Sequence, residues 1–153
     1  MKNARTTNSN ASALYKREYT IQDCLPRRMD TILAGVLVWL FEGVTPLTAW
    51  DGVEVFRTLH LDATIRTLKK KYRWAIIENV TLPTRRADGT IFYVAGYKLP
   101  QVVIDYAHSN PDMQSWIRLV KLAQARKRAR DDAKATALAS YRRSTNQQYM
   151  YRR

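Results

Sequence analysis

Apolar residues recur at intervals of three and four positions across residues 32–41, which predicts a helix with a wide buried face. Asp30 lies just before this stretch, where we expect it to cap the helix, and Gly43 lies just after it, where glycine commonly ends a helix. The ten-residue apolar run is about half as long as a membrane span, so we expect a buried helix and no membrane contact.

A second, shorter helix is predicted to begin at Thr45-Pro46, because threonine caps helices and proline is tolerated at the first helical position. Leu47, Trp50 and Phe56 supply its apolar spacing. Gly52 weakens the interior of this helix by about 1 kcal/mol relative to alanine, which a close crossing by a neighbouring helix would explain.

A third helix is predicted over residues 60–71, after a short connection typical of a helix-turn-helix. Leu61, Ile65, Leu68 and Tyr72 share its buried face. The opposite face carries small residues, a hydroxyl and cations, which are the side chains that a helix needs to approach base edges in a major groove. The candidate base-reading residues are His60, Ala63, Arg66, Thr67 and Lys70.

Two β-like stretches follow, over residues 76–82 and 90–99, and Asp88-Gly89 between them predicts a hairpin. Arg85 and Arg86 lie near its tip, where they can follow a phosphate backbone or enter a minor groove. The order of three helices and a two-stranded ribbon predicts a winged helix-turn-helix.

The remainder of the chain predicts a long basic helix. A short apolar run at residues 102–106 precedes Ser109-Asn110-Pro111-Asp112, a strong helix start. Apolar residues then form one face, which either packs on the domain or pairs with a second copy as a homodimer: Met113, Trp116, Ile117 and Val120. After Leu122 cations and alanines dominate, so this half is predicted to be an exposed basic helix, or disordered without a partner.

The predicted fold class is therefore mainly α with a small β-hairpin: a winged helix-turn-helix followed by a long basic C-terminal helix. Residues 1–27 are predicted to be a flexible basic arm and residues 28–99 the winged helix-turn-helix domain. Residues 100–139 form the C-terminal helical extension, and residues 140–153 a flexible basic tail.

Charge points to a polyanionic partner. The chain has 26 Lys and Arg against 13 Asp and Glu, a net charge of +13. Residues 29–58, which hold the first two predicted helices, carry one cation and four acids, whereas the segments on either side are basic. We expect sequence-independent contacts to a DNA backbone from Lys69, Lys71, Arg73, Arg85, Arg86, Arg126, Lys127, Arg128 and Arg130.

The sequence offers no catalytic signature. It contains two histidines, His60 and His108, and one cysteine, Cys24, with no metal-ligand spacing and no glycine-rich phosphate loop. We therefore expect no enzyme, no metal and no cofactor. A single cysteine excludes a disulfide within the chain, and residues 1–13 lack an apolar stretch, so a cytoplasmic location is expected.

The region from Ile32 to Leu99 resembles the small helix-turn-helix domains common in bacteriophage and prophage genomes. The resemblance is carried by Thr45-Pro46-Leu47, by the spacing of Leu61, Ile65 and Leu68 before Lys69-Lys70, and by Tyr97-Lys98-Leu99. The chain departs from that pattern at Lys71, where the family usually has glycine, and at His60, where it often has arginine. The resemblance implies a DNA-binding regulator.

The expected function is binding of double-stranded DNA by a phage or mobile-element transcriptional regulator, in the cytoplasm of a bacterial host. The basic C-terminal half leaves a second role open: a phage replication, excision or packaging factor, or a protein that binds RNA or single-stranded nucleic acid. A third alternative is a protein-protein adaptor acting on a host protein, since winged domains also serve that purpose and fold alone does not fix function.

Overall fold

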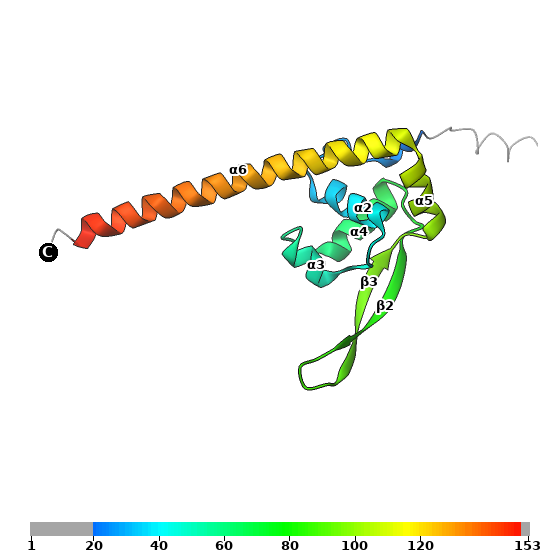
Figure 1. Ribbon diagram of the computed structural model, residues 1–153, viewed down its shortest axis with the longest axis horizontal. Coiled ribbons are helices and arrows are strands. Elements are labelled where there is room, and N and C mark those ends of the chain that lie inside the picture. The colour runs from blue at the N-terminus through cyan, green and yellow to red at the C-terminus, as the bar shows by residue number, and fades with distance from the viewer. Residues whose placement is uncertain (1–19, 151–153) are drawn as a thin grey trace, which may run out of the picture.

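The computed structural model describes residues 20–150, with side chains through Thr145 (Figure 1). It is mainly helical, with a small antiparallel sheet and a long C-terminal helix, which confirms the coarse prediction of the fold class. The elements in chain order are η1 (Ile21–Cys24), α2 (Ile32–Glu42), β1 (Leu47–Thr48), α3 (Ala49–Glu54), α4 (Leu61–Lys71), β2 (Glu78–Arg85), β3 (Ile91–Lys98), α5 (Gln101–Ser109) and α6 (Pro111–Met150).

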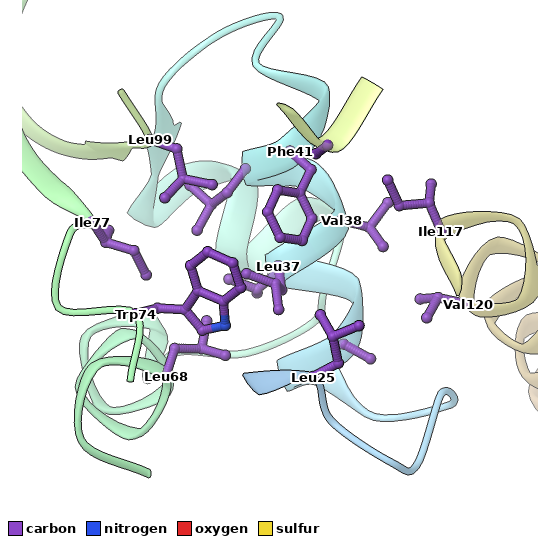
Figure 2. Packing of buried hydrophobic residues seen from close by; sticks show 14 of the residues in the cluster. Leu25, Leu37, Val38, Phe41, Leu68, Trp74, Ile77, Leu99, Ile117 and Val120 are labelled. Carbon is purple, nitrogen blue, oxygen red and sulfur yellow. The ribbon is translucent and has the colours of Figure 1, made fainter. Parts of the chain in front are cut away.

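Helix α2 forms the centre of the molecule. Seven of its eleven residues are buried, and they lie around the whole circumference of the helix, as in a helix packed on several sides. Figure 2 shows Leu37 beside Trp74 and Leu68 on one side of α2, whereas Val38 points toward Ile117 and Val120 of α6 on the other. Helix α2 therefore separates α4 from α6.

The two ends of α2 are set by local hydrogen bonds. Gly43 ends the helix in the left-handed conformation, with φ of 62°, as predicted. The N-cap is Thr31, whose hydroxyl oxygen accepts from the Ala34 amide at 3.3 Å, so the prediction of Asp30 as the cap was wrong. Asp30 lies one residue too early to reach that amide, and its carboxylate pairs instead with Arg28 at 3.6 Å.

The second helix begins later than predicted. Leu47 and Thr48 form β1, which pairs with Tyr97 and Gly96 of β3, so Pro46 is not the first helical residue. Thr48 caps α3 in a reciprocal arrangement: its hydroxyl oxygen accepts from the Asp51 amide at 3.4 Å, and its own amide donates to the Asp51 carboxylate at 2.7 Å. The sheet pairing and this capping box together outweigh the Thr-Pro signal.

The short α3 is only partly buried. Trp50, predicted to lie on its apolar face, is 66% exposed, and Phe56 lies half-buried in the connection beyond the helix. Gly52 is buried, and a Cβ there would lie 3.2 Å from the Leu61 Cβ. This contact with the start of α4 confirms the close approach proposed for the glycine.

The sheet has the strand order β1-β3-β2, and all pairs are antiparallel. The hairpin of β2 and β3 runs from the Glu78–Lys98 pair to the Arg85–Ile91 pair and projects from the body (Figure 1). The sequence prediction ended the first strand at residue 82, but β2 continues through Pro83, which an edge strand tolerates because one side of it has no partner. Gly89 turns the tip with φ of 86°.

Helix α6 begins as predicted, because the Asn110 side-chain oxygen accepts from the amides of Asp112 and Met113 at 3.0 and 3.1 Å. Its apolar face is fully used within the protein, with Met113, Trp116, Ile117 and Val120 all buried. That face therefore packs on the protein's own core, which was one of the two predicted alternatives, and the homodimer through residues 113–120 stays a prediction.

The ends of the chain differ from the predicted organisation. Leu25 and Pro26, placed in the predicted arm, are buried, and the Trp74 indole donates to the Cys24 carbonyl at 2.7 Å. Residues 1–19 of that arm lie outside the described residues. At the other end α6 continues to Met150, whereas a tail was predicted from residue 140.

Among the helices described, none combines the length and apolar character needed to cross a membrane.

We predict that Leu37→Ala destabilises the protein by roughly 2–5 kcal/mol. Leu37 is a fully buried residue of α2 that lies beside Trp74 and Leu68, and its truncation leaves a cavity there. Leu138→Ala makes the same change on a side chain that is 51% exposed, and should cost less than about 0.5 kcal/mol. Chemical denaturation followed by circular dichroism measures both. Equal losses in the two variants would contradict the central position of α2.

Candidate nucleic-acid interface

Helix α4 presents the predicted face to solvent. Leu61, Ile65 and Leu68 are buried in the core, so the opposite side of the helix points away from α2. Of the predicted base-reading residues, Ala63, Arg66 and Lys70 are exposed on that side and Thr67 is half-buried at its margin. His60 is exposed at the N-cap position, where its side chain makes no capping hydrogen bond.

Two local interactions orient polar groups on this face. The Thr67 hydroxyl donates to the Ala63 carbonyl at 3.0 Å, which leaves the hydroxyl oxygen free to accept. The Arg66 guanidinium lies 3.7 Å from the Asp62 carboxylate, one helical turn earlier, and both side chains are mostly exposed. Such a surface pair contributes little to stability, so Arg66 can exchange it for another acceptor.

Asp62 was missing from the sequence-based set of site residues. It lies in the first turn of α4, where a carboxylate is stabilised by the positive end of the helix dipole. Its spacing of four residues from Arg66 was the available signal. On this surface a carboxylate repels phosphate, and among base edges it can accept only from a donor such as the cytosine amino group.

Cations surround the C-terminal end of α4. The Lys69 ammonium donates to the Asn79 side chain at 3.3 Å, which links the helix to the base of β2. Lys71 lies over the Tyr72 ring at 5.6 Å, and Arg73 is exposed in a left-handed turn with φ of 62°. Lys69 therefore lies between α4 and the hairpin, and Lys71 and Arg73 are exposed at the C-terminal end of the helix.

The tip of the hairpin holds Arg85 and Arg86, both exposed. The Arg86 guanidinium carbon lies 5.0 Å from the centroid of the Phe92 ring, a cation-π contact that holds the side chain along β3. Asp88 closes the turn, since its carboxylate accepts from the amide and the hydroxyl of Thr90 at 2.9 and 2.6 Å. The two arginines therefore sit on an ordered turn.

The hairpin also exposes apolar residues that the sequence did not identify. Ile91 and Tyr93 are 58% and 70% exposed and share one face of β3 with Ala95. An exposed strand face is normally recognised by polar residues at every second position. The four consecutive apolar residues from Ile91 to Val94 lack that alternation, so nothing in the sequence indicated that one face of β3 is exposed.

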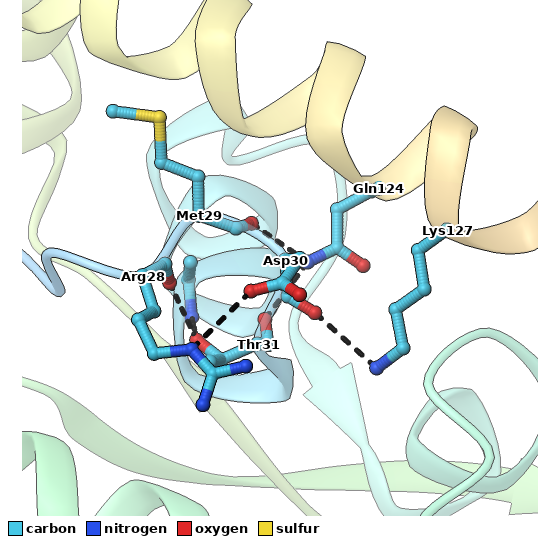
Figure 3. A network of polar contacts seen from close by, with 7 residues as sticks. Arg28, Met29, Asp30, Thr31, Gln124 and Lys127 are labelled. Atoms are coloured by element: carbon cyan, nitrogen blue, oxygen red, sulfur yellow. Dashed lines mark hydrogen bonds and ion pairs between the residues drawn. The ribbon is translucent and has the colours of Figure 1, made fainter.

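The cations of α6 divide into two groups. Lys127 donates to the Asp30 carbonyl at 3.2 Å and Arg128 to the Val55 carbonyl at 3.4 Å, so these two predicted backbone-contacting residues hold α6 against the body. Figure 3 shows Lys127 beside Gln124, whose amide donates to the Met29 and Thr31 carbonyls at 3.0 and 2.8 Å. Arg126 and Arg130 are exposed.

Comparisons with protein-family models, with curated proteins and with solved structures gave no match. In the part of the chain that the structure describes, no three side chains of histidine, cysteine, aspartate or glutamate are grouped in a way that could hold a metal ion. The candidate site is therefore defined by its own geometry: the exposed face of α4, the cations at its end and the arginine-bearing hairpin.

The hairpin turn should respond to acid. The hydroxyl and amide of Thr90 lower the pKa of Asp88, so the ionised carboxylate favours the turn above the ordinary aspartate pKa, and this effect is lost as pH falls through the lowered value. An NMR titration that follows the Thr90 amide should give a midpoint below the ordinary aspartate value. Thr90→Ala removes the hydroxyl donor and should raise that midpoint. A midpoint at or above the ordinary value in the unmodified protein would contradict the turn geometry.

Proposed function

We propose that this chain is a double-stranded DNA-binding protein of the winged helix-turn-helix type, acting as a phage or mobile-element transcriptional regulator. The order α2-β1-α3-α4-β2-β3, with β1 joined to the inner strand of the hairpin, supports this proposal. In that arrangement α3 and α4 are the helix-turn-helix pair and the β2–β3 hairpin is the wing.

The observation that carries the proposal is the exposed face of α4. A helix that enters a major groove needs small side chains for close approach and long donors that reach base edges, and Ala63, Arg66 and Lys70 provide these on one side. Arg66 is suited to a bidentate contact with guanine, and the Thr67 oxygen to accepting from an exocyclic amine. His60 extends this surface at the helix N-terminus.

The remaining cations supply affinity without sequence preference. Lys69, Lys71 and Arg73 lie at the end of α4, and Arg85 and Arg86 lie at the tip of the wing, so a duplex on α4 meets positive charge along its flank. If six phosphates are neutralised, the logarithm of the binding constant should fall with the logarithm of salt concentration with a slope of roughly −5.

The experiment is a selection from random duplex DNA at near-physiological salt, followed by affinity measurements on the recovered motif. We expect a motif to emerge and Arg66→Ala to weaken binding to it by about 1–3 kcal/mol, with little effect on random duplexes. Arg118→Ala is the matched control, because Arg118 is an exposed arginine on α6, on the other side of α2. Its affinity for the motif should stay close to that of the unmodified protein.

Equal weakening of motif and random duplexes by Arg66→Ala would reassign Arg66 to the phosphate backbone. Strong binding with no recovered motif would favour a packaging or architectural role. Absence of binding would favour the second candidate, a protein adaptor, for which the exposed Ile91 and Tyr93 of the wing are the supporting observation.

A further inference from the structure

The distal half of α6 extends beyond the body. The ion pair between Arg57 and Asp132, at 4.0 Å, is its last polar contact with the body in chain order. For the described side chains from Ala133 to Thr145, the hydrogen bonds stay within the helix. At about 1.5 Å per residue, residues 133–150 reach roughly 27 Å farther, as the red end of the helix shows in Figure 1.

One side of this helix carries a row of cations. Arg126, Arg130 and Lys134 follow one another at intervals of four residues, so they form a continuous stripe, and all three are exposed. Ala133 and Ala137 border this basic stripe and allow a close approach. Asp131 borders the stripe three residues before Lys134, and Asp132 faces Arg57 of the body.

The basic stripe belongs to α6, which α2 separates from the helix of the proposed DNA-reading face. Helix α2 packs against α4 on one side and against α6 on the other (Figure 2). The exposed face of α4 points away from α2. Arg126 and Arg130 lie beside the residues by which α6 contacts the body, and Lys134 lies beyond the last of these contacts in chain order. Figure 1 shows the wing projecting away from α6 as well.

We propose that the basic stripe of α6 binds the phosphate backbone of a second DNA duplex, so that one protein molecule bridges two duplex segments. This inference rests on the proposed function, because it requires the first duplex on α4. Charge complementarity favours a polyanion, because the three exposed cations of the stripe follow one another along the helix. A duplex supplies phosphates along the length of a straight helix.

The test is a two-duplex capture with the full chain. A biotinylated duplex carrying the selected motif is immobilised, protein is bound and washed, and a fluorescent duplex of unrelated sequence is added. The variant Arg126→Gln, Arg130→Gln, Lys134→Gln should bind the first duplex within about threefold of the unmodified protein and capture at least about tenfold less of the second. Glutamine keeps a high helix propensity, and circular dichroism checks that the helix remains.

The matched control removes three cations from the same helix but from other sides of it: Arg118→Gln, Arg142→Gln, Arg143→Gln. This control should capture the second duplex within about threefold of the unmodified protein. Sedimentation of the free protein at the assay concentration determines whether it is a monomer or a dimer. This control is needed because a dimer could bridge two duplexes through its two α4 faces without using the stripe.

The outcomes separate this inference from the proposed function. If the unmodified protein binds no duplex, the proposed function fails. If it binds the first duplex but captures no second one, the inference alone fails. Equal capture by both triple variants, weakening of the first duplex by the stripe variant, or preferential capture of an RNA hairpin offered in place of the second duplex would each overturn the bridging proposal.

Discussion

Packing of α2 against two different partners fixes where the other elements lie. Leu37 lies on the side that holds Leu68 and Trp74, and Val38 on the side that holds Ile117 and Val120. The Phe41 ring packs edge-on against both Trp74 and Trp116. A helix buried on both sides must have neighbours on both sides, and here these neighbours are the two most basic helices. The apolar packing of α2 thus determines where the basic surfaces of α4 and α6 lie.

The polar contacts refine what this core allows. Gln124 and Lys127 satisfy carbonyls that lie just before and at the cap of α2, which sets α6 along that helix and leaves its other side to solvent. Asn79 and Lys69 similarly join the base of the hairpin to the end of α4. The acceptors in these bonds are backbone carbonyls and the Asn79 side-chain amide, which carry no charge. The bonds therefore fix the positions of the helices without neutralising any cation.

The sequence predicted those parts of the fold that depend on local information. The bounds of α4 follow from Leu61, Ile65 and Leu68, and the end of α2 follows from the left-handed conformation that Gly43 adopts readily. The start of α3 could not be found in this way, since Leu47 becomes a strand only by pairing with Tyr97, fifty residues later. Tertiary pairing overrode a local signal.

The candidate site shows the same division. The exposed face of α4 was predicted because helical periodicity separates buried from exposed positions. The roles of Lys127 and Arg128 were not, because the carbonyls that they bind belong to Asp30 and Val55, far away in sequence. A run of cations looks uniform in the sequence, and only the packing of α6 distinguishes those that hold the body from those that stay exposed.

We propose that duplex DNA binds on α4 and the β2–β3 hairpin. NMR chemical-shift mapping with a duplex recovered by selection tests it most directly, since each backbone amide reports its own surroundings. We predict the largest changes at Ala63, Arg66, Thr67, Lys70 and the hairpin residues Arg85 and Arg86. Unchanged α4 resonances in a protein saturated with duplex would contradict it.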